Sequence, residues 1–270
     1  MKADGKTTKY VRFERAGIVS YGILESDVVK ELEGDIFAGA ALTGRAFPVS
    51  QTRFLVPCEP SKVLAVGLNY ASHRVHVESA EGVILNAAGR PVPSDYPGVF
   101  AKFPTSLIPH GQDIVFPDDA TNVHFEGELA LIVGKKAKKV SVEEARDFIF
   151  GVTICNDLVD REWLLEDLQW FRAKGSDNFG PIGPAIVTGL DYDNLKLETR
   201  VNGEVRQSSN TSELVFSPDK ILSYCSQYVT LLPGDVIFTG TPGKTQAVAK
   251  GDTIEVEIEG IGVLRNAVAA

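Results

Sequence analysis

Two glutamates, Glu126 and Glu128, are separated by one residue within the apolar stretch HFEGELALIV. The stretch alternates with period 2, which predicts a β-strand that carries both carboxylates on one face. Carboxylates about 7 Å apart repel each other unless they share a proton or a cation, so the pattern favours a site for a hard divalent ion. A strand edge with a solvated acidic face is the alternative, but the apolar residues around the pair predict that both strand faces are largely covered.

Asp157 is the candidate third ligand of this ion. It follows Asn156 at the end of the apolar stretch VTIC, which predicts a buried strand that delivers both polar side chains at its end. Asp157 could instead cap the helix that we expect over LVDREWLLEDLQWF. The pattern alone does not separate these two roles.

Four further residues have side chains that could act on a substrate. His73 and His76 are three residues apart and share one face if their segment is helical; they could bind metal, although paired surface histidines are commoner. Lys174 lies in a loop rich in glycine and proline, where it could meet a carboxylate or enolate oxygen or simply point to solvent. Thr241 lies in TGTPGKT, which is no phosphate loop because Phe238 stands where that motif needs glycine. Its hydroxyl could hold a carboxylate.

The elements that must position these residues are mostly strands. Residues 1–55 consist of short alternating segments broken by glycines and predict a small antiparallel accessory lobe, followed by the main domain over residues 56–270. A buried strand ends at Gly67, and the long loop over residues 79–98 is expected to be a lid. Near the C-terminus, Gly-Asp turns repeatedly open strands, which is typical of a β-rich roll or barrel.

Local signals locate the remaining elements. Ser141 and Glu144 form a capping box that predicts a helix over SVEEARDFIF. Asn202-Gly203 is a type I′ turn signal and predicts a hairpin over residues 195–206. Ser217 followed by proline predicts the start of an amphipathic helix.

Composition limits the partners and the compartment. The 270 residues carry a formal net charge of −9, which argues against a nucleic-acid backbone or an anionic membrane as partner, so an anionic substrate must meet a local cation. The three cysteines are widely spaced and form neither a zinc motif nor a disulfide framework. Because no apolar run approaches the roughly 20 residues of a membrane span, we expect a cytoplasmic protein.

Several phrases, in their order along the chain, resemble the fumarylacetoacetate hydrolase (FAH) superfamily. They are VLAVGLNYASH, FEGELALIVGKKA, GVTICNDLVDRE, WFRAKGSDNFGPIGP, LLPGDVIFTGTPG and GDTIEVEIEGIGVLRN. The resemblance implies an α+β, β-rich fold, namely a mixed β-sandwich roll with a small N-terminal β lobe, assembled as a homodimer. It also implies Mg²⁺ or Mn²⁺, with Ca²⁺ as a substitute, bound by Glu126, Glu128 and Asp157.

The resemblance further implies roles for residues around the metal. It places Arg161 and Lys174 near the substrate, makes Thr241 a carboxylate contact and makes His73 the lid histidine that helps to activate water. Many members carry His-x-x-Glu on the lid; here His76 occupies the second position and Glu78 follows two residues later, so either could be the partner of His73.

A second departure concerns substrate choice. Leu164 stands three residues after the arginine, where the family often has glutamine. Because a buried polar substrate group would lose a partner worth about 1–3 kcal/mol, the accepted substrate should change.

The implied function is a divalent-metal-dependent hydrolase that cleaves a C–C bond in 2-oxo acids of the acylpyruvate or fumarylpyruvate type through a metal-stabilised enolate. The first alternative is a decarboxylase of oxaloacetate or a related 2-oxo diacid, which needs no attacking water. Isomerase and hydratase variants share the scaffold, since a fold does not determine a reaction. A non-catalytic family member that only binds metal is the alternative from another class.

Overall fold

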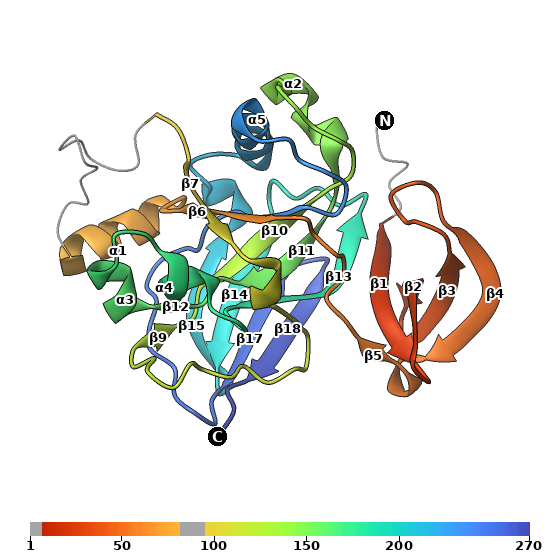
Figure 1. Cartoon of the computed structure of the whole chain (residues 1–270), viewed down its shortest axis with the longest axis horizontal. Coiled ribbons are helices and arrows are strands. Elements are labelled where there is room, and N and C mark those ends of the chain that lie inside the picture. The colour runs from red at the N-terminus through yellow and green to blue at the C-terminus, as the bar shows by residue number, and fades with distance from the viewer. Residues whose placement is uncertain (1–6, 82–94) are drawn as a thin grey trace.

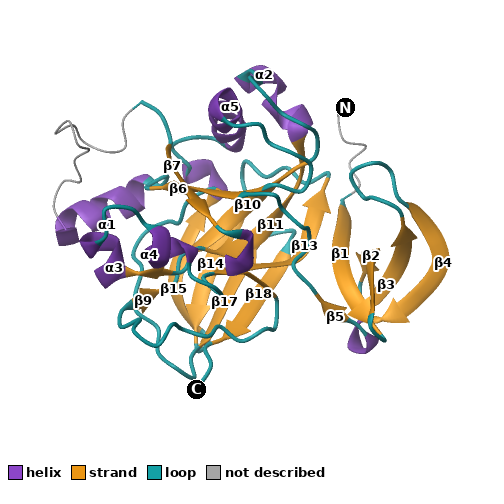
Figure 2. Ribbon diagram, viewed as in Figure 1, coloured by secondary structure: helices purple, strands orange, loops and turns teal. Residues whose placement is uncertain are grey.

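The structure, a computed structural model, describes residues 7–81 and 95–270. Strands dominate, and the helices lie around their margins (Figure 2). This architecture confirms the predicted α+β, β-rich fold class. Most of the segment predicted to be a lid, residues 82–94, lies outside the described residues.

The N-terminal lobe is an antiparallel sheet, as predicted, drawn in red to orange at one side of Figure 1. Its first strand also pairs antiparallel with strand β13 of the main body, from Thr8 opposite Thr188 to Tyr10 opposite Ile186. The lobe therefore continues the main sheet by backbone hydrogen bonds. Its strands are β1 (Thr8–Arg15), β2 (Ile18–Glu25), β3 (Val28–Glu33), β4 (Ala41–Pro48) and the short β5 (Arg53–Phe54), which pairs with β1.

The main sheet has the strand order β4-β3-β2-β1-β13-β11-β10-β16-β6-β7, and β8 pairs in parallel with β13. Strand β10 lies in the middle of this order, between β11 and β16. The strands of the main body are β6 (Val63–Gly67), β7 (Gly98–Lys102), β8 (Leu107–Pro109), β10 (Gly127–Val133), β11 (Ile149–Asn156), β13 (Gly180–Thr188) and β16 (Val236–Phe238).

A second sheet with the order β15-β14-β17-β18 packs on one face of the main sheet. Leu129 and Leu131 of β10 share a buried cluster with Leu197 of β14 and Val256 of β17. This contact makes the core of the sandwich. The strands are β14 (Lys196–Val201), β15 (Glu204–Asn210), β17 (Thr253–Ile258) and β18 (Gly262–Ala267).

The other face of β10 is buried as well. Ala130 and Ile132, which alternate with the leucines, pack in a second cluster with Val63 and Phe238. Every residue of β10 is buried, which confirms that both faces of this strand are covered. A carboxylate that continues the Ala130 face is therefore kept from bulk water.

The strand predicted over residues 124–133 is interrupted. It consists of β9 (Val123–His124) and β10, with Phe125 and Glu126 between them. At the break, the backbone N–H of Glu126 donates to the side-chain oxygen of Asn156 at 2.8 Å, and the N–H of Asp157 donates to the carbonyl oxygen of Glu126 at 2.8 Å. A side-chain amide thus replaces one ladder bond and lets the backbone turn at Glu126.

The helix predicted over residues 158–171 is also wrong in its limits. The segment forms β12 (Val159–Asp160), α3 (Arg161–Glu166) and, after a break, α4 (Phe171–Gly175). Asp160 is the N-cap, because its side chain accepts from the backbone N–H groups of Glu162 and Trp163. The capping role considered for Asp157 is therefore excluded, and Asp157 is left for the site.

The remaining local predictions hold, with one shortened element. The Ser141 side chain caps α2 (Val142–Ala145), but a 3₁₀ turn follows and β11 begins at Ile149, inside the predicted helix. Helix α5 (Pro218–Tyr228) begins after the capping Ser217. The β14–β15 hairpin turns at Asn202 and Gly203, whose φ angles are 53° and 81°.

Helix α1 (Ala71–Glu81) follows β6, so the segment that carries His73 and His76 is helical. In the part of the chain that the structure describes, the helices are all too short or too polar to cross a membrane.

Candidate metal centre

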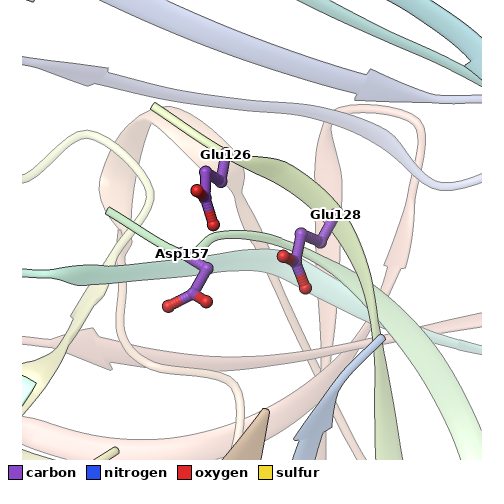
Figure 3. Close-up of side chains that lie close together, drawn as sticks. All are labelled: Glu126, Glu128 and Asp157. Atoms are coloured by element: carbon purple, nitrogen blue, oxygen red, sulfur yellow. The ribbon is translucent and has the colours of Figure 1, made fainter. Parts of the chain in front are cut away.

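The carboxylates of Glu126, Glu128 and Asp157 converge at the interrupted end of β10 (Figure 3). One ligand oxygen from each lies within 4.8 Å of the others, and the residues are 5%, 1% and 1% exposed. Glu126 lies in the break between β9 and β10, Glu128 is the second residue of β10, and Asp157 directly follows the end of β11. The structure thus brings all three predicted metal ligands together from two adjacent strands.

Two lysines meet this trio of carboxylates. The Nζ of Lys174 is 2.6 Å from Oε2 of Glu126 and 2.8 Å from Oδ2 of Asp157. The Nζ of Lys102 is 2.7 Å from Oδ1 of Asp157 and also donates to the carbonyl oxygen of Lys174. Arg161 approaches Oε1 of Glu126 at 3.8 Å. Sequence reasoning proposed Lys174 and Arg161 but missed Lys102, a single lysine at the end of the apolar strand β7.

The positive charge is distributed unevenly over the trio. Within the described residues, the Glu128 carboxylate accepts one hydrogen bond, from the backbone N–H of Gly240 at 2.7 Å, and forms no ion pair. Burial and the charges of Asp157 and Glu126 hold its pKa well above the ordinary value. Burial also acts to raise the pKa of Glu126, but Lys174 and Arg161 outweigh it and lower that pKa.

This arrangement fits a hard divalent cation. The donors are all carboxylate oxygens, which Mg²⁺ and Mn²⁺ prefer. A buried carboxylate without an ion-pair partner is costly, and among the described residues Glu128 has none. The residues that would hold the ion are Glu126, Glu128 and Asp157.

His73 of α1 lines the same cavity as the three carboxylates. It is 4% exposed, and its Nδ1 lies 2.7 Å from the carbonyl oxygen of Gly243. Because a carbonyl can only accept, Nδ1 carries a proton and the neutral ring has its lone pair on Nε2. Burial lowers the pKa of His73, which favours that neutral ring.

The two candidate partners of His73 differ in what can be said of them. The side chain of Glu78 is exposed and is absent from the described lining of the pocket. His76 lies in α1, but its side chain is outside the part that the structure describes. The structure therefore brings His73 to the carboxylates and leaves Glu78 away from them.

Thr241 is buried beside the trio and is held on both sides. Its hydroxyl donates to the carbonyl oxygen of Gly127 at 3.0 Å and accepts from the side-chain amide of Gln207 at 2.9 Å. Gln207 also donates to the carbonyl oxygen of Pro242 at 2.6 Å, which fixes the loop after β16. Sequence reasoning found Thr241 but not Gln207, which comes from the distant strand β15.

Most of the polar side chains described above, but neither Lys102 nor Gln207, line one cavity of about 230 Å³. Its polar floor holds the three carboxylates, Lys174, Arg161, His73 and Thr241. The rest of its wall is largely apolar and includes Val66, Leu68, Val77, Phe100, Leu164 and Trp170. Leu164, where the motif suggested a glutamine, therefore presents an apolar surface to any bound molecule.

Comparison with known proteins agrees with the fold. The family model for fumarylacetoacetate (FAA) hydrolase, C-terminal, matches residues 62–269, and the model Rv2993c-like, N-terminal, matches residues 8–57. The chain therefore belongs to the fumarylacetoacetate hydrolase family, which confirms the predicted resemblance. Members of this family are enzymes, among them hydrolases, isomerases and tautomerases.

Three relatives show the range of these activities. Oxaloacetate tautomerase FAHD2A, mitochondrial, of Bos taurus is 38% identical over 234 residues, covering 82% of this chain and 71% of that protein. The structure of 5-carboxymethyl-2-hydroxymuconate delta-isomerase from Mycobacterium smegmatis is 40% identical with a TM-score of 0.87, covering 97% of this chain and 99% of that one. Fumarylpyruvate hydrolase from Pseudomonas aeruginosa, solved with Mn²⁺ and pyruvate, is 27% identical with a TM-score of 0.69, covering 80% and 91%.

Proposed function

We propose that this chain is a divalent-metal-dependent enzyme that moves a proton between the keto and enol forms of a small 2-oxo acid. One observation carries the choice of reaction: His73 stands against the carboxylates, whereas Glu78 is exposed and outside the described lining. A single base suffices to carry a proton between the carbon next to the ketone and the enolate oxygen. Activation of water by His73 together with His76 or Glu78, as in the predicted hydrolase, would need a second group, and Glu78 lies outside the described lining.

The chain's own residues account for the steps. A divalent ion at the three carboxylates would supply Lewis-acid polarisation of the keto group. Lys174 and Arg161 bring positive charge to the floor of the cavity, where they stabilise negative charge on the oxygens of the acid. In the keto-to-enol direction the unprotonated Nε2 of His73 takes the proton from the carbon next to the ketone and delivers it to the enolate oxygen, and the enol-to-keto direction reverses both transfers.

The cavity supports a small, anionic substrate. Its volume of about 230 Å³ accommodates a short acid. Lys174 and Arg161 supply the local cations that the net charge of −9 demands for an anion. The oxaloacetate tautomerase among the relatives supports a 2-oxo diacid such as oxaloacetate as the first compound to test.

Hydrolysis of a C–C bond in acylpyruvates is the second candidate. The fumarylpyruvate hydrolase solved with Mn²⁺ and pyruvate favours it, because that protein shares the fold over 80% of this chain. Decarboxylation of oxaloacetate would use the same centre without a base for water. The homodimer implied by the resemblance stays a prediction, which sedimentation would test.

The test uses EDTA-stripped protein with Mn²⁺ added back, first with enol oxaloacetate and then with an acylpyruvate, and it identifies products by NMR. Metal-dependent conversion of enol to keto oxaloacetate is expected, with loss of rate in Glu126→Gln. His73→Asn should lower kcat by about 10²- to 10⁴-fold. The matched variant Glu78→Gln should keep kcat within about threefold, since an exposed group outside the cavity supplies no proton.

Each other outcome identifies a competing function. Pyruvate and a second carboxylic acid from acylpyruvate, with strong loss in Glu78→Gln, would establish the hydrolase. CO₂ release from oxaloacetate would establish the decarboxylase. Mn²⁺ binding without turnover of either compound would support the non-catalytic family member.

A further inference from the structure

Asp157 is held by two buried lysines, one on each carboxylate oxygen. Lys102 lies 2.7 Å from Oδ1, and Lys174 lies 2.8 Å from Oδ2. A divalent ion at Asp157 would be repelled by both ammonium groups at short range, most strongly by the one that stands among the ligand oxygens. The two lysines must therefore differ in what they do when an ion enters.

Lys102 is the anchored member of the pair. Its side chain is 0% exposed and does not line the described cavity. Besides Asp157 it holds the carbonyl oxygen of Lys174, so it ties the end of β11 to helix α4. Departure of Lys102 from Oδ1 would leave a buried charge and a buried carbonyl without partners.

Lys174 also donates to a backbone carbonyl, that of Asp157 at 3.0 Å, but it is the member of the pair that borders the cavity. It lines the cavity, and its ammonium lies over the ring of Phe100, 5.5 Å from the ring centre. It bridges Oε2 of Glu126 and Oδ2 of Asp157, two oxygens of the ligand set. Its single charge thus stands in part of the space between ligands that a divalent ion would require.

We propose that Lys174 is the built-in counter-ion of the metal centre and yields its place to the divalent ion, whereas Lys102 stays on Oδ1 and positions Asp157 for binding through Oδ2. The inference rests on the proposed function, because it takes the same three carboxylates as ligands. Released from Glu126 and Asp157, the Lys174 ammonium faces the cavity and is available to an anionic substrate. Metal loading therefore precedes productive substrate binding.

The test compares two variants that remove the same charge from the same carboxylate. Mn²⁺ affinity is measured by calorimetry, without substrate, for the full-length wild type, Lys174→Met and Lys102→Met. Lys174→Met should bind Mn²⁺ about tenfold more tightly or better, because a competing cation is gone. Lys102→Met should bind about 10- to 100-fold more weakly, as expected for loss of a group that orients a ligand. The exposed Lys136→Met is the control and should match the wild type.

The opposite signs separate positioning from charge. If both variants bind Mn²⁺ more tightly, the lysines act only as nearby charges, and the positioning role of Lys102 is wrong. If Lys174→Met binds more weakly, Lys174 is no competitor of the ion. Should Lys102→Met fail to fold, Lys102→Gln is used instead. Its neutral side chain is one atom shorter, so it should hold Asp157 Oδ1 and the carbonyl oxygen of Lys174 less firmly and bind Mn²⁺ more weakly than wild type; tighter binding would overturn the positioning role. A wild type that binds no Mn²⁺ would refute the metal centre itself, and with it the proposed function.

Discussion

Replacing Glu128 with glutamine should stabilise the metal-free protein, although it removes a candidate ligand. The amide oxygen can still accept from the backbone N–H of Gly240, as the carboxylate does. The amide NH₂ can donate toward the carboxylates of Glu126 and Asp157, which the native side chain repels. The substitution thus exchanges a buried repulsion for a neutral donor of nearly the same shape.

The geometry sets the size of the effect. The ligand atoms of the trio lie within 4.8 Å of one another, and at that distance two unit charges repel by about 3.5 kcal/mol at an effective dielectric constant of about 20. Glu128 has two such neighbours, but Lys174 attracts it and its raised pKa relieves part of the repulsion by proton uptake. We expect a net gain of about 1–3 kcal/mol in the free energy of unfolding.

The pH dependence gives this prediction a sign. The pKa of Glu128 lies above its ordinary value of 4.5 in the folded protein, so the folded state holds this proton more tightly than the unfolded state does. The contribution of Glu128 to stability therefore declines as the pH rises above that ordinary value. The advantage of Glu128→Gln over the wild type should widen in the same direction.

Urea unfolding of EDTA-treated protein measures the difference. Glu31→Gln is the matched control, because Glu31 is also buried but accepts from Ser20, Thr43 and Arg45. Loss of those charge-assisted bonds should cost about 1–3 kcal/mol. A metal-free Glu128→Gln protein that is destabilised as much as Glu31→Gln would refute the reasoning, since the trio would then gain nothing from losing a charge.

Three other predictions concern metal, packing and capping. At a free Mn²⁺ concentration about 100 times its Kd, binding to the folded state adds about 2.7 kcal/mol to the free energy of unfolding. A thermal melt should show this gain for the wild type and not for Glu126→Gln, and equal gains in both proteins would exclude Glu126 as a ligand. In Gly127→Ala the new Cβ would lie 2.1 Å from Oγ1 of Thr199, and this clash should lower the free energy of unfolding by about 1–3 kcal/mol. In urea unfolding, the double variant with Thr199→Ala should recover part of that loss; if it recovers none, the clash lies elsewhere. The Asp160 carboxylate accepts from four backbone N–H groups. In urea unfolding, Asp160→Ala should lose at least about 2 kcal/mol of the free energy of unfolding and Asp160→Asn should lose less, whereas equal losses would argue against the hydrogen bonds as the cause.

Much of the fold could be predicted because its signals are local. The alternation of β10 follows from the period of a strand, and the Asn202-Gly203 hairpin follows from the positive φ angles that its turn requires. Ser141 and Ser217 mark helix starts by the same short-range logic. The three carboxylates could be predicted in the same way, since each of them lies at the start or directly after the end of an apolar strand.

The misses depend on contacts between distant segments. The break at Glu126 requires the side chain of Asn156, which is supplied by the neighbouring strand. Asp160, rather than Asp157, became the cap because strand pairing continues to Asp160 through β9 and β12. The residues near Lys102 in the sequence do not indicate that its partner is Asp157, 55 residues away. A lysine at the end of an apolar strand was nevertheless a sign of a buried acidic partner.

Because β1 pairs with β13, the N-terminal lobe covers an edge of the main sheet that could otherwise pair with another molecule. Strand β13 has β11 along one side, while β8 and β1 share the other, and β1 covers Ile186 to Thr188. A chain lacking the lobe would expose these backbone N–H and C=O groups beside apolar side chains, which is a template for pairing with another molecule. The lobe thus covers a sheet edge that would favour aggregation. The edge strand of the extended sheet is then β4, whose eight residues are mostly exposed.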